Sequence, residues 1–125
     1  MPEAPALIAV VDDEESMRKA LQRLFRSAGF AVETYASGAE FLKSVQSHEP
    51  ACLVLDLHMP ELNGLEVQHE LIRSGSKVPV VIITGHDTPE ARTRALFRGA
   101  QAYLQKPVDD LTLLAAVNAG IDPDG

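Results

Sequence analysis

Five polar side chains that could do chemistry stand at the ends of apolar, branched stretches of this 125-residue sequence. Asp12 and Asp13 follow the first stretch, Asp56 the third and Thr84 the fourth, and Lys106 lies just beyond the fifth. Parallel strands bind ligands at their carboxyl ends, so we expect these side chains on one rim. Three carboxylates that lie together repel one another unless a cation compensates them. Oxygen ligands without cysteine or histidine favour Mg2+.

A phosphoryl group is the substrate that suits this set of side chains. Lys106 and Thr84 offer an ammonium and a hydroxyl to the oxygens of an anion. A carboxylate beside Mg2+ can be the nucleophile that accepts a phosphoryl group. Asp56 is the candidate, because it stands alone whereas Asp12 and Asp13 are paired. Asp13 by itself could instead be a helix cap, but capping does not explain the whole set of residues after four stretches.

The apolar stretches themselves are typical of β-strands, at residues 7–11, 31–35, 52–55, 80–83 and 102–104. The first, third and fourth are apolar throughout, which predicts central strands covered by helices on both faces. The second alternates more, so we expect it at an edge of the sheet.

Helical patterns separate the predicted strands. Start signals stand at Ser37, Asn63, Thr88 and Asp109 or Asp110, and the first, third and fourth helices end at glycines. The positions expected to face the core are Met17, Leu21, Leu24, Phe25, Ala28, Phe41, Leu42, Val45, Val67, Leu71, Ile72, Leu111, Leu114, Ala115 and Val117. We expect the fifth helix to end at about Ala119, before Gly120.

Strict alternation of strands and helices predicts one α/β domain, a doubly wound five-stranded parallel sheet of the (βα)5 kind. The length and the 46% apolar and 23% charged composition fit a single globular domain over residues 1–125. We expect a folded core over residues 6–120 and short flexible tails at both ends.

Charge and cysteine content exclude several classes of function. Eighteen acidic residues against eleven basic ones give a net charge of -7, which disfavours direct binding to nucleic acid or to anionic membrane. The only cysteine, Cys52, is expected to be a small buried hydrophobe. No signal-peptide pattern or membrane-length apolar run is present in the sequence, so we expect a cytoplasmic, soluble protein. Seven basic residues are expected on solvated helix faces, namely Arg18, Lys19, Arg23, Arg26, Arg92, Arg94 and Arg98.

Four motifs, in order along the chain, carry a resemblance to a known family. They are Val11-Asp12-Asp13-Glu14, then Asp56-Leu57-His58-Met59-Pro60 with Gly64 eight residues after Asp56, then Ile83-Thr84-Gly85, and Lys106-Pro107. Over nearly the whole chain the sequence resembles the receiver domain of two-component response regulators. That resemblance implies the flavodoxin-like strand order 2-1-3-4-5.

The resemblance also implies roles for individual residues. Asp56 would accept a phosphoryl group from a phosphohistidine on a sensor histidine kinase. Asp13 and Asp56 would hold Mg2+ together with the backbone carbonyl of His58, and Asp12 would act partly through water. Lys106 would bind the phosphoryl oxygens. Two positions are expected to be structural, Gly64 and Pro107, the latter after a cis peptide bond.

A switch pair is implied as well. Thr84 would move toward the phosphoryl group, and the ring of Tyr103 would turn into the space that Thr84 leaves. The face built from the fourth helix, fifth strand and fifth helix would then meet an output domain, a downstream protein or a second copy of the chain in a homodimer. The alternative for Tyr103 is an aromatic residue that only covers the core. His58 and His86 would tune hydrolysis of the acyl phosphate, or are ordinary loop histidines.

Within the family the details are most similar to the FixJ/NarL-type (LuxR-family) transcription regulators. The segments concerned are Tyr35-Ala36-Ser37-Gly38, Gly64-Leu65-Glu66-Val67-Gln68 and Thr84-Gly85-His86. This implies an output in transcription. The DNA-binding helix-turn-helix usual in that subfamily is not among these 125 residues, so the chain is either a receiver cut from a longer regulator or a stand-alone regulator.

Two other functions remain open at this stage. A magnesium-dependent phosphatase that works through an aspartyl-phosphate, like the haloacid-dehalogenase enzymes, would place a second Asp two residues after the nucleophile, where this chain has His58. A pseudo-receiver that binds partners without taking phosphate would not need every rim residue, yet all of them are present. The phosphoacceptor role, with only self-catalysed phosphotransfer and dephosphorylation, is the preferred hypothesis. A glycine-rich nucleotide loop is absent from the sequence, and His69-Glu70 lacks the second histidine of a zinc-protease motif.

Overall fold

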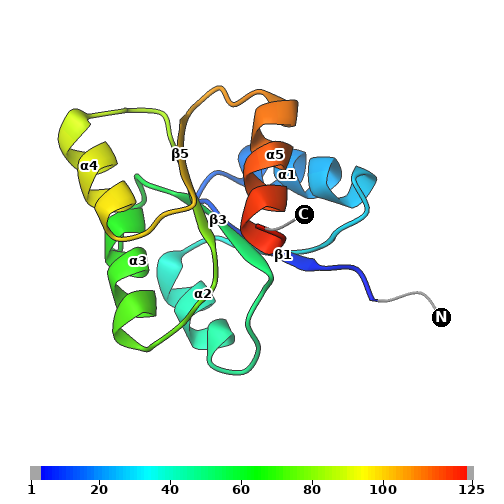
Figure 1. Ribbon diagram of the computed structural model, residues 1–125, viewed down its shortest axis with the longest axis horizontal. Coiled ribbons are helices and arrows are strands. Elements are labelled where there is room, and N and C mark those ends of the chain that lie inside the picture. The colour runs from blue at the N-terminus through cyan, green and yellow to red at the C-terminus, as the bar shows by residue number, and fades with distance from the viewer. Residues whose placement is uncertain (1–3, 124–125) are drawn as a thin grey trace.

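The computed structural model describes residues 4–123, which form five strands and five helices in strict alternation (Figure 1). The strands are β1 (Leu7–Val11), β2 (Ala31–Tyr35), β3 (Cys52–Asp56), β4 (Val80–Thr84) and β5 (Ala102–Gln105). The helices are α1 (Glu15–Ser27), α2 (Gly38–Val45), α3 (Gly64–Arg73), α4 (Pro89–Phe97) and α5 (Asp110–Ile121). The outermost parts of the tails predicted to be flexible, residues 1–3 and 124–125, lie outside the described residues.

The sheet has the strand order β2-β1-β3-β4-β5, and all four neighbouring pairs are parallel. The predicted fold class and strand order are therefore confirmed. β2 lies at an edge and is only half-buried, while β3 and β4 are buried along their whole length. β3 and β4 each run one residue further than predicted and include Asp56 and Thr84, because both residues pair with the neighbouring strand.

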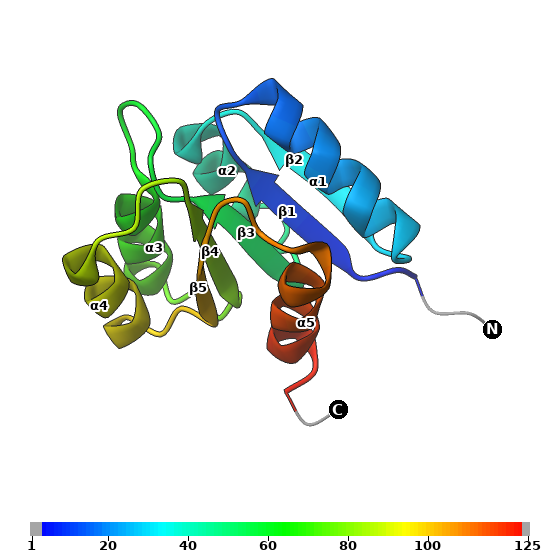
Figure 2. The same cartoon turned by 90° about the horizontal axis from the view of Figure 1, so that it is seen from above.

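Helices cover both faces of the sheet. α1 and α5 pack on one face, and α2, α3 and α4 pack on the other (Figure 2). The alternation along β3 shows the division, because Leu53 and Leu55 belong to the core under α2–α4 whereas Val54 belongs to the core under α1 and α5. This two-layer cover explains why the central strands are apolar throughout.

Four of the five helices begin at the predicted caps. Ser37, Asn63, Thr88 and Asp109 each accept a hydrogen bond from the backbone N–H three residues later. At Asn63 the partner glutamate completes a capping box.

The predicted inward faces of α1, α3 and α5 are partly wrong. Ile72 is 50% exposed and Leu111 is 76% exposed, and Ala28 and Ala115 also face solvent. α5 is apolar nearly all round, so its periodicity does not select one face, and packing against the sheet buries Leu113 instead. The helix also continues through Gly120 to Ile121.

Gly64, the first residue of α3, touches the backbone at the end of β3. A Cβ on Gly64 would lie 2.7 Å from the carbonyl oxygen of Asp56 and 2.9 Å from the Cα of Leu57. The amide of Gly64 also donates to the carbonyl of Leu57, at 2.8 Å. Only glycine permits this approach, which explains the structural role expected for Gly64.

Replacing Gly64 with alanine should therefore destabilise the protein, because backbone atoms at the end of β3 would have to shift. We expect Gly64→Ala to lose about 1–3 kcal/mol of unfolding free energy, measured by urea denaturation. Gly85→Ala is the control, since a Cβ on Gly85 meets nothing within 4 Å. Equal stability of the two variants would contradict the close-packing explanation.

Candidate functional site

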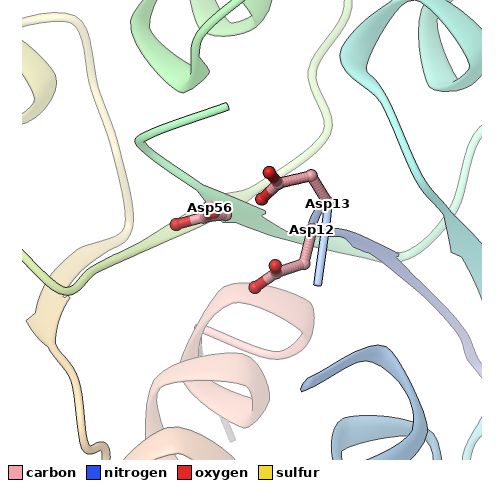
Figure 3. A group of neighbouring side chains, drawn as sticks. All are labelled: Asp12, Asp13 and Asp56. Carbon is pink, nitrogen blue, oxygen red and sulfur yellow. The ribbon is translucent and has the colours of Figure 1, made fainter. Parts of the chain in front are cut away.

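Three carboxylates meet where β1 and β3 end side by side. Asp12 and Asp13 follow β1, and Asp56 ends β3 (Figure 3). One carboxylate oxygen from each residue lies within 4.8 Å of the others. We call these three residues the acidic cluster. Asp12 and Asp56 are buried and Asp13 is exposed, so the cluster has one wall open to solvent. The expected convergence of the three carboxylates is thus observed.

Asp12 is the most firmly held member of the acidic cluster. Its Oδ1 accepts a hydrogen bond from the amide of Glu14 at 2.9 Å, and its backbone carbonyl accepts one from Nη1 of Arg18 at 2.8 Å. The expectation that Arg18 is merely solvated is wrong. Arg18 lies one turn after Glu14, where its guanidinium reaches back over the loop that carries the cluster.

Asp13 is not a helix cap. The N-cap residue of α1 is Glu14, and no side chain caps that end of the helix. The alternative in which Asp13 serves only to cap α1 is therefore wrong. Its carboxylate lies in the acidic cluster and on the exposed side of it.

Lys106 is the cation that the structure brings to the acidic cluster. Its Nζ lies 3.2 Å from Oδ2 of Asp12, 3.4 Å from Oδ1 of Asp56 and 3.9 Å from Oε1 of Glu14. Burial by itself would lower the pKa of Lys106, but attraction to Asp12 and Asp56 outweighs burial and raises this pKa. Lys106 therefore stays charged. The Lys106–Pro107 peptide bond is cis, as the resemblance implied.

The charged form of Asp56 is disfavoured even though Lys106 lies close to it. Its side chain is only 5% exposed. Burial first, and then the charge of Asp12, raise the pKa of Asp56 from 3.8 to about 6, while Lys106 acts in the opposite direction. One lysine thus does not fully balance three carboxylates. A set of hard oxygen atoms with residual negative charge fits a divalent cation such as Mg2+.

Thr84 lies beside the rim, but its hydroxyl is engaged locally. Oγ1 donates to the carbonyl of His86 at 3.1 Å and accepts from the amide of His86 at 3.0 Å. Nε2 of His58 lies 3.1 Å from the same carbonyl, and the rings of His58 and His86 stand edge to face with centroids 5.8 Å apart. His58 and His86 therefore connect the loops after β3 and β4. This connection depends on tertiary contact and was not predicted.

Tyr103 is buried in β5, with 4% of its surface exposed. Its ring belongs to the core under α2–α4. The switch expectation placed the ring inside only after Thr84 had moved, yet the ring is buried while Thr84 is still bonded to His86. Burial, and then the nearby charge of Asp87, raise the pKa of Tyr103.

Two further expectations concern residues away from the rim. Cys52 is buried, and burial raises the pKa of its thiol to about 12, which agrees with a small apolar role. Within residues 4–123, helices long and apolar enough to cross a membrane are absent.

Comparison with known proteins places the chain among close relatives. The model of the response regulator receiver domain matches residues 8–118. Nodulation protein W of Bradyrhizobium diazoefficiens is 42% identical over 119 residues, which cover 95% of this chain and 52% of that protein. Transcriptional regulatory protein FixJ of Azorhizobium caulinodans is 36% identical over 121 residues, which cover 97% of this chain and 57% of that protein. The chain spans about half the length of the curated relatives it matches.

Among solved structures, the crystal structure of FixJ-N is similar over nearly its whole length. The TM-score is 0.88 at 30% sequence identity, and the match covers 98% of this chain and 96% of that one.

The raised pKa of Asp56 predicts that removing its charge stabilises the fold in metal-free buffer. Because the folded pKa of about 6 exceeds the unfolded value of 3.8, ionisation of Asp56 costs stability increasingly as pH rises from about 4 to 6, and fully above that range. We expect Asp56→Asn to be more stable than the parent by on the order of 1–3 kcal/mol at pH 7.5 and by nothing at pH 4.

Chemical denaturation at both pH values measures this difference. Asp13→Asn is the comparison, and its gain should be smaller because Asp13 is exposed and contributes least to the raised pKa of Asp56. A gain for Asp56→Asn that is the same at pH 4 and pH 7.5 would show that charge is not its cause.

Proposed function

Because the chain belongs to the response regulator receiver family, we propose that it is a phosphorylation-activated signalling switch in which Asp56 is the phosphoacceptor. The observation that carries the proposal is the contact of one lysine with two carboxylates of the acidic cluster. Members of this family act in two-component systems, so the proposed donor is a phosphohistidine on a sensor histidine kinase. The proposed location is the cytoplasm, where such a kinase would present its phosphohistidine.

The proposed reaction is a phosphoryl transfer between two protein side chains. A carboxylate oxygen of Asp56 attacks phosphorus, a P–O bond forms, and the P–N bond to the donor imidazole breaks with its electron pair leaving on nitrogen. The products are an acyl phosphate on Asp56 and a neutral histidine once that nitrogen is protonated. Lys106 would bind the phosphoryl oxygens, and its Nζ at 3.4 Å from Oδ1 of Asp56 supports this role.

The acidic cluster is the proposed site of Mg2+. Asp12, Asp13, Asp56 and the backbone carbonyl of His58 would hold the ion, which supplies positive charge to the oxygens of the transferring group. Asp12 is already anchored by Glu14, Arg18 and Lys106, so its carboxylate is a fixed part of this site.

Thr84 and Tyr103 are the proposed switch pair. The Thr84 hydroxyl would exchange the His86 carbonyl for a phosphoryl oxygen, and His58 would remain on that carbonyl. To move an equilibrium between two states from 1:99 to 99:1, one state must be stabilised over the other by about 5.5 kcal/mol. Two or three charge-assisted hydrogen bonds to a new phosphoryl group supply that order of energy. His58 and His86 are proposed to tune hydrolysis of the acyl phosphate, and their mutual contact between the loops after β3 and β4 supports this.

The proposed output is transcriptional, through the face of α4, β5 and α5. FixJ of Azorhizobium is named as a transcriptional regulatory protein, and this chain matches about half of it. We propose that the face acts on an output domain or a separate partner, and that phosphorylation promotes a homodimer. Near the end of α4, Phe97 is 91% exposed, an apolar side chain of the kind often buried by a partner.

Phosphorylation itself is tested with a small phosphodonor and Mg2+, followed by intact mass measurement. We expect the wild type to gain the mass of one phosphoryl group and Asp56→Asn to gain none. Glu61→Gln, on the exposed loop after β3, is the control and should behave like the wild type. Addition of a phosphoryl group to Asp56→Asn would refute Asp56 as the phosphoacceptor. Hydrolysis of many phosphodonor molecules per chain would favour the magnesium-dependent phosphatase. A wild type that gains no mass would favour the pseudo-receiver.

Lys106→Ala should react with the phosphodonor at least about tenfold more slowly, because the transferred charge loses a buried cation. Lys77→Ala is the matched control, since Lys77 is exposed on the loop before β4. The time course of the mass change measures the rates. A Lys106→Ala rate equal to that of Lys77→Ala would exclude a role for Lys106 in the transfer.

A further inference from the structure

Tyr103 is covered on its outer side by a residue that belongs to none of the rim motifs. The guanidinium carbon of Arg92, on α4, lies 5.4 Å from the centroid of the Tyr103 ring. That distance is within the range of a cation–π interaction. Salt bridges that involve Arg92 are absent from the described part of the chain, so the ring is the partner of this charge. Arg92 is thus not the purely solvated residue that the sequence suggested.

The buried position of Tyr103 also carries a free-energy cost. Its hydroxyl is buried and makes no hydrogen bond of good geometry within residues 4–123, although the side chain of Asp87 and the backbone of Thr88 lie near it. An unpaired buried hydroxyl favours the rotamer that exposes the oxygen to water. The penalty of such a group and the gain from a cation over an aromatic ring are of the same order. The balance between buried and exposed rotamers is therefore sensitive to Arg92.

The register of the sheet places Tyr103 close to Thr84. Tyr103 pairs with Ile82 and Thr84 pairs with Gln105, so the ring lies on the strand beside Thr84. Arg92 lies one turn before Ala95, the buried residue by which α4 packs into the same core. A shift of α4 along β5 would move the guanidinium relative to the ring.

We propose that Arg92 is a positioning residue that holds Tyr103 in its buried rotamer before any phosphorylation. α4 then sets the resting position of the switch tyrosine, in addition to the control that Thr84 exerts. The inference rests on the proposed function only in treating Tyr103 as part of a switch, because the rotamer claim needs neither phosphate nor Mg2+.

Tyrosine fluorescence offers a direct test, since the chain has two tyrosines and no tryptophan. In a Tyr35→Phe background Tyr103 is the only fluorophore, and acrylamide quenching of the unphosphorylated protein measures its exposure. Arg92→Gln should raise the quenching constant by about twofold, and Arg92→Lys should lie between Arg92→Gln and the parent. Arg94→Gln, an exposed arginine on the same helix, should leave the constant unchanged.

An unchanged constant in Arg92→Gln, or an equal rise in Arg94→Gln, would overturn the proposal. If Tyr35→Phe does not fold, fluorotyrosine NMR of the chain with both tyrosines gives the same answer, with the Tyr103 signal assigned by Tyr103→Phe. In that experiment, a fluorine chemical shift of Tyr103 that moves toward the value of free fluorotyrosine in Arg92→Gln supports the proposal. An unchanged chemical shift refutes it. A chain that fails to take phosphate but passes this test would refute the proposed function and leave the role of Arg92 intact.

Discussion

The repulsion among three carboxylates at the end of β1 and β3 is the constraint on which the rest of the site depends. The parallel pairing of these strands forces Asp12, Asp13 and Asp56 together, and two of the three are buried. Lys106 relieves part of the repulsion, but the pKa of Asp56 stays near 6. The fold thus maintains a place where added positive charge is favourable and where a carboxylate is poised next to a cation.

The same constraint explains the surroundings of the acidic cluster. Arg18 and the amide of Glu14 fix Asp12 from the side of α1, and the close approach of Gly64 fixes the backbone of Asp56 from the side of α3. These contacts hold the carboxylates in place against their repulsion. In contrast, Thr84 and His58 bond to a loop carbonyl, an arrangement that can change without breaking the sheet. The rigid and the adjustable parts of the rim are therefore distinct.

The two halves of α4 make different contacts. Its second half is tied to α3 in both directions, because Gln68 donates to the carbonyl of Ala95 and Arg98 donates to that of Leu65. Its first half contacts β5 through Arg92 and Tyr103. A change in the loop after β4 would therefore move the first half of α4, which lies over Tyr103, more readily than the second half.

The sequence by itself determined the alternation of elements, the central and edge strands, the helix caps and the residues at the strand ends, because these follow from local periodicity, capping chemistry and the geometry of parallel sheets. The motifs were sufficient to assign the response regulator receiver family and its FixJ-like branch. Only the tertiary structure decided the buried face of α5, the anchoring of Asp12 by Arg18, the shared carbonyl of His86 and the cover of Tyr103 by Arg92. Such contacts join residues from different elements, as Lys106 and Asp12 do across 94 positions. No local pattern records which side chains meet once the helices have packed on the sheet.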